Sequence, residues 1–417
     1  MKHRNELTAN VSNPFAALKH KSYRYYWIGM AVSTTGTWMQ NVAQPWLAYK
    51  LTDSAFLLGL VSALQFLPVL LFSLFAGVII DRFPKKNILY LTQIASFFIT
   101  LVLAILTYTG HIQFWHLIIT STLLGFVNTM DMPARQSFVI ELVGKEDLTN
   151  GIALNSMQFN LARIIGPALA GIIMGPWGVA SCFLINSISY GAVIISLFFV
   201  KPYPIEKVQM KQVKMMANIA DGLKFIFRKK TLLIPLSFLA VGATFAMNMN
   251  VLVPVFSIEV LHQGEAGFGL LMSLAGVGAL MGALTMAAVS KGGPRKAFLY
   301  VFPIIAGILV LAIGFTKIYA LTGITLLLVS FFFMIFMASV NTTMQMNSAN
   351  EFRGRVMSVY SLVVAGSTPL GNLYAGAFTE KLGPSVGFIA CGIAVLVLLI
   401  PLYLLQKRQR DLETINN

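Results

Sequence analysis

Apolar residues gather in twelve runs of about twenty residues or more along the chain, separated by shorter polar segments. The runs are continuously apolar and lack the alternation of apolar and polar positions that marks the strands of a membrane barrel. Because a helix needs about 20 apolar residues to cross a bilayer, each run predicts one membrane-spanning helix. The predicted spans are 25–48, 56–80, 88–109, 114–138, 151–174, 179–200, 232–261, 267–290, 297–316, 319–343, 356–379 and 384–405.

The composition supports this prediction. Of 417 residues, 57% are hydrophobic and 11% are charged, whereas a soluble domain carries about 25% charged residues. One large soluble core is a poor alternative, because cores split beyond about 250–300 residues. The sequence therefore predicts an all-α polytopic membrane protein with twelve transmembrane helices.

Motifs for metal, nucleotide or covalent chemistry are missing from the sequence. The five histidines are scattered, without HExxH or zinc-type spacing, and no GxxxxGK[ST] loop occurs. Cys182 and Cys391 lie inside apolar runs and indicate small buried side chains rather than a disulfide. We expect no cofactor and no metal. A membrane enzyme is disfavoured, because no nucleophile or acid pair gathers at one depth.

Basic residues are distributed unequally between the two sides of the predicted bundle. If the N-terminus is cytoplasmic, 26 Lys and Arg residues fall in cytoplasmic segments and 3 fall in outside loops, while Arg163 lies within a span. The positive-inside rule then predicts that both termini are cytoplasmic. The net charge of +15 indicates topology and contact with anionic lipid rather than nucleic-acid binding.

The chain repeats its landmarks across a long basic segment. Asn41-x-x-x-Pro45 recurs as Asn250-x-x-x-Pro254, the 81–86 loop recurs at 291–296, and "NTMDM" at Asn128 recurs as "NTTMQM" at Asn341. This order predicts a duplicated six-span unit with a substrate site between the halves. The predicted parts are a cytoplasmic tail (1–24), an N-terminal bundle (25–200), a basic linker with an amphipathic helix (201–231), a C-terminal bundle (232–405) and a second tail (406–417).

The loop after the second span carries Gly77-x-x-x-Asp81-Arg82-x-Pro84-Lys85-Lys86. It resembles the loop between spans 2 and 3 of the major facilitator superfamily, with Pro84 where glycine is usual. The resemblance covers nearly the whole chain and implies two pseudo-symmetric six-helix bundles that work by alternating access. The second-half copy is degenerate, because Lys291 stands where the aspartate would be.

Charges near this loop form a candidate gate. Asp131 and Arg135 end span 4 on the same side, four residues apart on one helical face. We expect these two residues and the loop charges to form a network that locks the two halves together when the cytoplasmic side is closed. The resemblance implies that the start of span 11 is a partner of this network. The alternative is that these charges only anchor helix ends. The candidates are Asp81, Arg82, Lys85, Asp131, Arg135 and Arg355.

Span 5 contains small residues that resemble the antiporter motif of the superfamily, with alanine at three glycine positions. The resemblance implies an exporter. Small residues at this spacing also allow close helix packing in general, which is the alternative interpretation. The motif residues are Ala162, Gly166, Pro167, Ala170 and Gly171.

Three longer stretches narrow the resemblance to one branch. They are "NPFAALKHKSYRYYWIG" before span 1, the segment from "DMPARQSF" to "IIGPALAG" across spans 4 and 5, and "RGRVMSVYSL" opening span 11. They are similar to bacterial siderophore exporters of the enterobactin type and to macrolide efflux proteins. The resemblance leaves the cargo open.

Polar residues within the spans are candidates for the transport path. Arg163 lies near the middle of span 5, and we expect it either to contact an anion or couple transport, or to form a static buried pair. Asp131 is the nearest candidate partner by depth in the membrane. Asp131 and Glu259 are further coupling candidates, because a buried carboxylate can titrate. The candidate cavity wall consists of Gln40, Asn41, Gln44, Asn128, Arg163, Asn248, Asn250, Asn341, Gln345 and Asn372, of which we expect about half to link helices instead.

These features predict a secondary-active exporter of a small amphipathic organic molecule, siderophore-like or drug-like, which exchanges protons by alternating access. We expect it to be a monomer. An importer or a lipid flippase on the same fold is the alternative. A channel is disfavoured by the charged gate and the repeated halves.

Overall fold

The computed structural model describes residues 14–203, 215–289 and 293–415, and these residues form helices without strands. The all-α prediction is confirmed. The elements are η1 (Ala16–Lys19), α1 (Lys21–Thr52), α2 (Ala55–Arg82), α3 (Lys85–Tyr108), α4 (Phe114–Val143), α5 (Leu148–Trp177), α6 (Val179–Phe199), α7 (Met215–Arg228), α8 (Lys230–Phe245), α9 (Met249–Glu259), α10 (Glu265–Val289), α11 (Lys296–Tyr300), α12 (Phe302–Ile313), α13 (Tyr319–Met346), α14 (Arg353–Leu382) and α15 (Pro384–Ile415).

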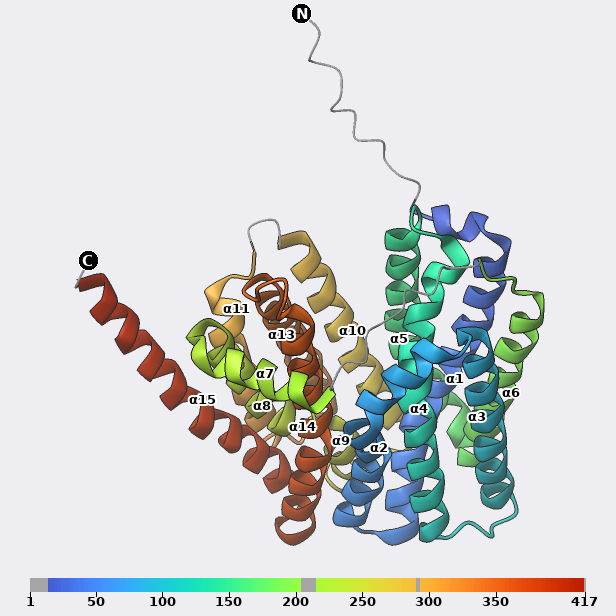
Figure 1. Ribbon diagram of the computed structural model, residues 1–417. Helices are drawn as coiled ribbons and strands as arrows, with labels where there is room; N and C mark the ends of the chain where they lie inside the picture. The colour runs from blue at the N-terminus through green and yellow to red at the C-terminus, as the bar shows by residue number, and fades with distance from the viewer. Residues whose placement is uncertain (1–13, 204–214, 290–292, 416–417) are drawn as a thin grey trace, which may run out of the picture.

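Among the residues that the structure describes, the helices make twelve spans in two bundles of six, as predicted. Within the described chain, nine helical stretches are long and apolar enough to cross a membrane, with α8 and α9 counted as one. The other three spans are α1 and α4, which carry more polar residues such as Gln40 and Asn128, and the pair α11 and α12. The N-terminal half consists of α1–α6 and the C-terminal half of α8–α15 (Figure 1).

Two spans that the sequence predicted as continuous are broken. The predicted span 232–261 is interrupted at 246–248, and the span 297–316 is interrupted at Val301. At the first break α14 crosses closely, because a Cβ on Gly371 would lie 1.9 Å from the carbonyl oxygen of Thr244. Asn248 Nδ2 donates to the same carbonyl at 2.8 Å. The side chain of Asn248 therefore supplies a hydrogen-bond donor to the carbonyl group of Thr244, close to the end of α8.

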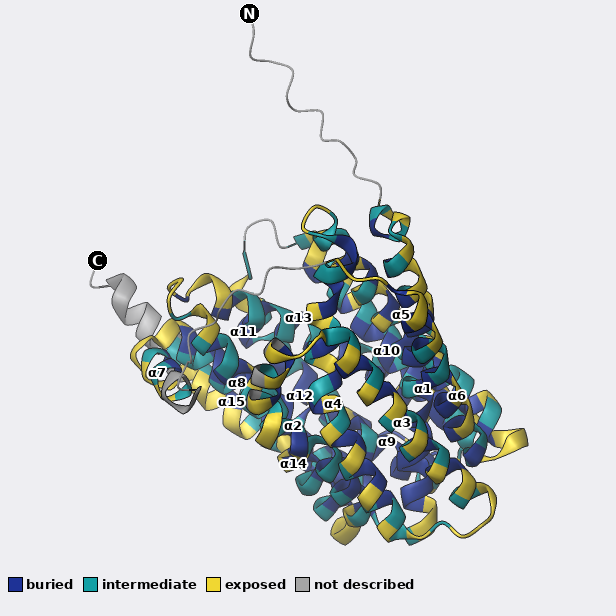
Figure 2. Cartoon of the chain, turned by 45° about the vertical axis from the view of Figure 1, so that its right-hand side comes forward, coloured by how far each residue is buried: buried dark blue, intermediate teal, exposed yellow. Residues whose placement is uncertain are grey.

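The outer surface of both bundles is apolar. Large side chains such as Leu91, Phe98 and Ile188 are more than half exposed along the helices, and Figure 2 shows exposed positions on outer helix faces and buried positions inward. Such a surface is unfavourable in water and favourable in lipid.

Alternate helix ends define two sides of the molecule. We call the side with the start of α1, the end of α2 and the start of α14 the basic end, and the side with Thr52, Tyr108 and Leu382 the far end. The first and last described residues both lie toward the basic end (Figure 1).

The two halves meet along two helix pairs, α2 with α14 and α5 with α10. The close approaches run from Ala55 beside Gly376 at the far end to Leu70 beside Gly366 near mid-helix. Figure 1 shows α5 and α10 adjacent in their far-end parts and diverging toward the basic end. The halves are therefore joined at the far end and separate toward the basic end.

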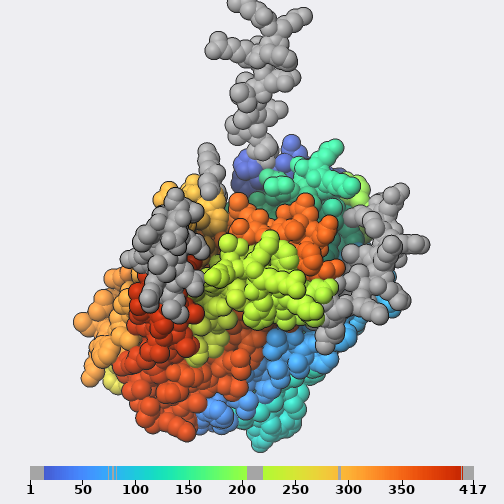
Figure 3. Space-filling model, turned by 60° about the vertical axis from the view of Figure 1, so that its left-hand side comes forward, coloured from blue at the N-terminus to red at the C-terminus, as the bar shows by residue number. Residues whose placement is uncertain are grey.

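The linker helix α7 packs on the C-terminal half at the basic end. Its Phe225 ring stacks on Phe352 just before α14, with ring centroids 4.6 Å apart and planes 7° apart. A Cβ on Gly222 would lie 2.8 Å from the carbonyl oxygen of Arg355, and Ile226 is buried. Figure 3 shows α7 lying across the surface there. The helix thus contacts the start of α14 along one face.

Candidate functional site

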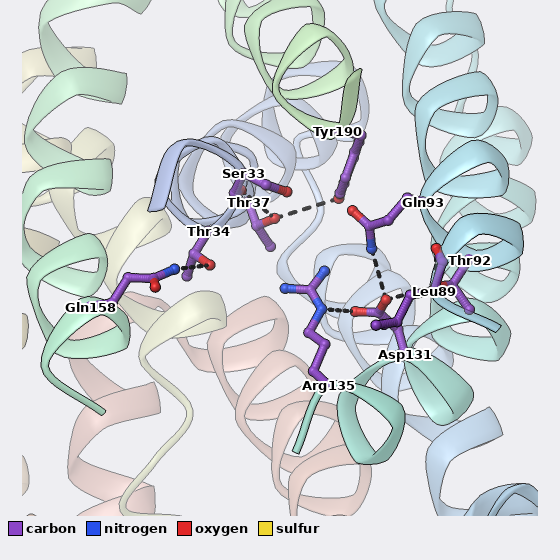
Figure 4. Close-up of polar contacts among 10 residues, drawn as sticks. All are labelled: Ser33, Thr34, Thr37, Leu89, Thr92, Gln93, Asp131, Arg135, Gln158 and Tyr190. Carbon is purple, nitrogen blue, oxygen red and sulfur yellow. Dashed lines mark hydrogen bonds and ion pairs between the residues drawn. The ribbon is translucent and has the colours of Figure 1, made fainter. Parts of the chain in front are cut away.

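A charged group near the basic end of α4 is held within the N-terminal half. Arg135 Nε pairs with Asp131 Oδ2, one turn earlier. The other oxygen of Asp131 accepts hydrogen bonds of 2.7 Å from Thr92 Oγ1 and Gln93 Nε2 of α3, and the residue is 4% exposed. Figure 4 shows the guanidinium and the two α3 donors around the carboxylate. Hydrogen bonds and a counter-charge offset the cost of burying Asp131, and the group ties α3 to α4.

Two other gate candidates pair with acids that the sequence did not single out. Lys85 Nζ lies 3.2 Å from Glu141 Oε1 of α4. Arg355 Nη1 lies 3.3 Å from Asp221 Oδ2 of α7. In the sequence Glu141 follows the predicted end of span 4 and Asp221 stands in the basic linker, so no local signal identified them.

Of the last two gate candidates, only Arg82 has a described side chain. Arg82 is exposed at the end of α2, and the side chain of Asp81 lies outside the described residues. The gate candidates that the structure describes therefore fall into separate contacts on α3, α4 and α14 rather than one cluster.

The two glutamines of α1 lie inside the N-terminal half. Gln40 Nε2 donates to Gln44 Oε1 at 3.1 Å, and Gln40 Oε1 accepts from Asn186 Nδ2 of α6 at 2.6 Å. Gln44 Nε2 donates to Ser121 Oγ of α4 at 2.7 Å. Both glutamines are buried, whereas Asn41 is half-buried. In this conformation the glutamines link α1 to α4 and α6.

The remaining cavity candidates differ in exposure. Asn248 and Asn372 are buried within the C-terminal half. Asn341 Oδ1 accepts a hydrogen bond from Gln345 Nε2 on the next turn of α13. Asn250 and Asn341 are half-buried, and Asn128 and Gln345 are exposed.

The small residues of the span-5 motif face two different neighbours. A Cβ on Gly166 would lie 2.4 Å from Cβ of Trp38 on α1. A Cβ on Gly171 would lie 3.1 Å from Cα of Gly269 on α10, and one on Gly269 would lie 2.5 Å from the carbonyl oxygen of Pro167. Both alanines of the motif, Ala162 and Ala170, are buried. The motif thus forms the close approach of α5 to α1 and to the other half.

Arg163 lies at the end of the α5–α10 contact that is nearer the basic end. Its carbonyl oxygen would be 2.6 Å from a Cβ on Gly276 of α10. Its guanidinium carbon is 5.6 Å from the ring centroid of Trp38, within the range of a cation–π interaction. Asp131, the nearest acid by depth in the sequence, pairs with Arg135 instead.

Three carboxylates of the C-terminal half accept hydrogen bonds from the N-terminal half at the far end. Tyr49 Oη donates to Glu259 Oε1, and Trp46 Nε1 donates to Glu265 Oε1 at 3.2 Å. Glu380 Oε2 accepts from the backbone N–H groups of Ala55 at 2.7 Å and Phe56 at 3.4 Å, at the start of α2. We call these three contacts the far-end seal.

The sequence identified only part of this seal. Glu259 was a coupling candidate, whereas Glu265 and Glu380 stand at helix ends and resemble loop charges. Their donors lie more than 200 residues away in the chain, so only the packing of the halves identifies them.

The described parts of the site suit movement of a molecule rather than its chemical conversion. They comprise a tight helix seam, buried amides and paired charges on two bundles. In the described chain, no three His, Cys, Asp or Glu side chains gather as a metal site.

A family model described as "Transmembrane secretion effector" matches residues 12–416. The chain belongs to this family. Two curated relatives agree with it. The Staphyloferrin A transporter of Staphylococcus aureus is 26% identical over 390 residues, which cover 92% of this chain and 96% of the relative. Macrolide efflux protein A of Streptococcus pyogenes is 23% identical over 391 residues, 90% of this chain and 93% of the relative.

A solved structure supports the fold. The bacterial homolog of the human lysosomal transporter Spinster superposes with a TM-score of 0.74 over 92% of this chain and 96% of that one, at 13% identity. The resemblance to the major facilitator superfamily and to its siderophore and macrolide exporters is confirmed. This chain is a multi-pass membrane transporter and not an enzyme.

Proposed function

We propose that this transporter exports a small amphipathic organic molecule, of siderophore or macrolide type, across the bacterial cytoplasmic membrane in exchange for protons. The observation that carries export is the match along nearly the whole chain to relatives named as a staphyloferrin A transporter and a macrolide efflux protein. The protein acts as a monomer with both tails in the cytoplasm.

Alternating access is supported by the position of the contacts between the halves. The far-end seal and the seam of α5 with α10 join the bundles at the outer side, while the helices diverge toward the basic end (Figure 1). With the basic end in the cytoplasm, this is a conformation open to the inside. The bundles 25–200 and 232–405 rock about their common seam, and the linker 201–231 joins them.

The cytoplasmic gate closes when its charges regroup. In the open conformation Arg355 is held by Asp221 and Arg135 by Asp131. On closure the start of α14 approaches the end of α2, and Arg355 exchanges Asp221 for the acid at the end of α2, Asp81. Arg82 and Lys85 stand beside this contact and hold its orientation.

Proton exchange requires a carboxylate that titrates during the cycle. Asp131 is our first candidate, because a change in the contacts between α3 and α4 would alter its donors Thr92 and Gln93. Glu259 is the second, since opening the far end would remove the hydrogen bond from Tyr49. Arg163 is the third candidate, and it would couple through the charge of the cargo.

Transport in inverted membrane vesicles tests this function. Vesicles with an acid interior are mixed with labelled siderophores and macrolides, and uptake is compared with vesicles that lack the protein. We expect uptake several-fold above that background, abolished by a protonophore. Absence of gradient-dependent uptake for every cargo would refute proton-coupled export, and uptake only in right-side-out vesicles would identify an importer.

A further inference from the structure

Arg163 is a cation near the middle of a membrane-spanning helix. It is the sixteenth of the thirty residues of α5 (Leu148–Trp177). A guanidinium at this depth is costly unless an anion or a water-filled space accompanies it. The interior of the protein must therefore provide for this charge, or a ligand must.

The described residues do not provide an anion for Arg163. The ion pairs recorded among them use Asp131, Glu141, Asp147 and Asp221 for other cations, and none includes Arg163. No hydrogen bond from its guanidinium to another described residue is recorded either. The carboxylates of the far-end seal accept their bonds from Trp46, Tyr49 and the start of α2.

An aromatic ring holds the guanidinium instead. Its central carbon lies 5.6 Å from the centroid of Trp38, and Trp38 in turn packs edge-on against Phe159 with centroids 5.6 Å apart. Gly166 leaves room for Trp38, because a Cβ there would lie 2.4 Å from Cβ of Trp38. A guanidinium held by its face keeps its N–H edges available for a bidentate oxyanion.

The location of Arg163 suits contact with cargo. Arg163 stands at the place where α5 separates from α10. Among the α5 residues that the glycines of α10 approach, it lies nearest the basic end, and the approach is to its carbonyl oxygen. Toward the basic end the two helices diverge (Figure 1). A molecule that enters between the halves from that end meets Arg163 before the closed seam.

We propose that Arg163, held over Trp38, binds an anionic oxygen group of the cargo, a carboxylate or a similar oxyanion. The inference rests on the proposed export function and narrows it. The cargo then combines an apolar or aromatic body with at least one negative oxygen group, and uncharged molecules of the same shape are carried less well.

A pair of probes with the same body tests the proposal. Pyrenebutyrate and its uncharged amide are offered to inverted vesicles containing the full-length protein, and gradient-driven uptake and equilibrium binding are measured for each. We expect the carboxylate to be preferred about tenfold, which corresponds to one charge-assisted hydrogen-bonded pair. Arg163→Gln should remove this preference, so that the carboxylate and the amide are handled alike.

Two variants control the measurement. Arg163→Lys keeps the charge without the planar donor edge, so it should retain part of the preference. Lys50→Gln removes another cation that lies 5.6 Å from a tryptophan centroid, that of Trp46 at the far end, and should leave the preference unchanged. A thermal unfolding midpoint of purified Arg163→Gln close to that of the parent shows that the variant is folded.

The outcomes separate the two levels of the proposal. Equal handling of both probes by the unmodified protein, or a carboxylate preference that survives in Arg163→Gln, overturns the anion site and leaves export standing. Uptake of neither probe, nor of any siderophore or macrolide, refutes export and the anion site together.

Discussion

Asp131 has different partners on its two carboxylate oxygens. One oxygen pairs with Arg135 and the other accepts from Thr92 and Gln93. A small rearrangement of α3 against α4 would change these contacts, as the coupling role proposed for Asp131 requires.

Replacing Asp131 by Asn tests this role. The variant leaves Arg135 without its counter-charge, so we expect the free energy of unfolding to fall by roughly 3 kcal/mol. We also expect gradient-driven uptake to be lost while exchange of labelled for unlabelled cargo, which needs no proton, persists. Glu141→Gln on the same helix breaks the pair with Lys85 and should cost less than about 1 kcal/mol. Intact gradient-driven uptake in Asp131→Asn would refute the assignment.

At the scale of single residues, sequence patterns located polar side chains more reliably than they assigned partners. Arg163 was recognisable as a cation within a span, yet the ring beneath it, Trp38, lies 125 positions earlier on α1. Gln40 and Gln44 were recognisable as polar positions of span 1, but which helices they face depends on the packing of α4 and α6. Partners of this kind follow from tertiary structure, for which local spacing carries no information.

At the scale of helices, composition predicts the spans because crossing a bilayer is a local requirement of length and apolarity. The break between α8 and α9 was not predictable in this way. It depends on Gly371 of α14, which reaches the carbonyl oxygen of Thr244 only in the folded bundle. Close helix approaches therefore decide features that apolar runs do not encode.

A leucine at position 171 tests the close approach of α5 to α10. The side chain would collide with Gly269 and Ala266, so the far-end seam could not close. Ser273→Cys, which replaces a buried seam residue, reports this opening by its rate of labelling with an impermeant maleimide from the far side. We expect an increase of tenfold or more, roughly the effect of 1.4 kcal/mol.

Gly175→Leu is the matched control, because a Cβ there has no neighbour within 4 Å. It lies one turn further along the same helix and should label as slowly as the parent. Background labelling should be low, since Cys182 and Cys391 are buried. Similar labelling of both leucine variants would contradict the role of the seam.

The linker helix offers a second test at this scale. Asp221→Asn removes the carboxylate that holds Arg355 in the present conformation. Both side chains are partly exposed, so we expect a shift of at most about 1 kcal/mol, or about fivefold, toward closure of the basic end. Slower maleimide labelling of Asn128→Cys would report it. Lys224→Gln, an exposed change on α7, is the control, and unaltered labelling in Asp221→Asn would exclude α7 as a holder of the gate.

For the whole molecule, the far-end seal sets the balance between its two conformations. Three contacts carry it, at Glu259, Glu265 and Glu380, and each acceptor lies on the half opposite its donor. Removing one acceptor by alanine leaves a donor unsatisfied at a cost of about 1 kcal/mol. Because Trp46 and Tyr49 stand one turn apart on α1, the three costs are not independent, and together they should amount to at most about 3 kcal/mol.

The alanine variants should therefore accelerate far-side labelling of Ser273→Cys in steps, about fivefold for one and up to about a hundredfold for all three. Glu146→Ala, an exposed acid at the basic end, should leave the rate unchanged. A triple variant that labels like the parent would mean that the helix seam alone holds the far end shut. A graded response would instead show that the strength of the far-end seal determines how long the transporter stays open to the basic end. That time in turn limits how often cargo can bind from this side.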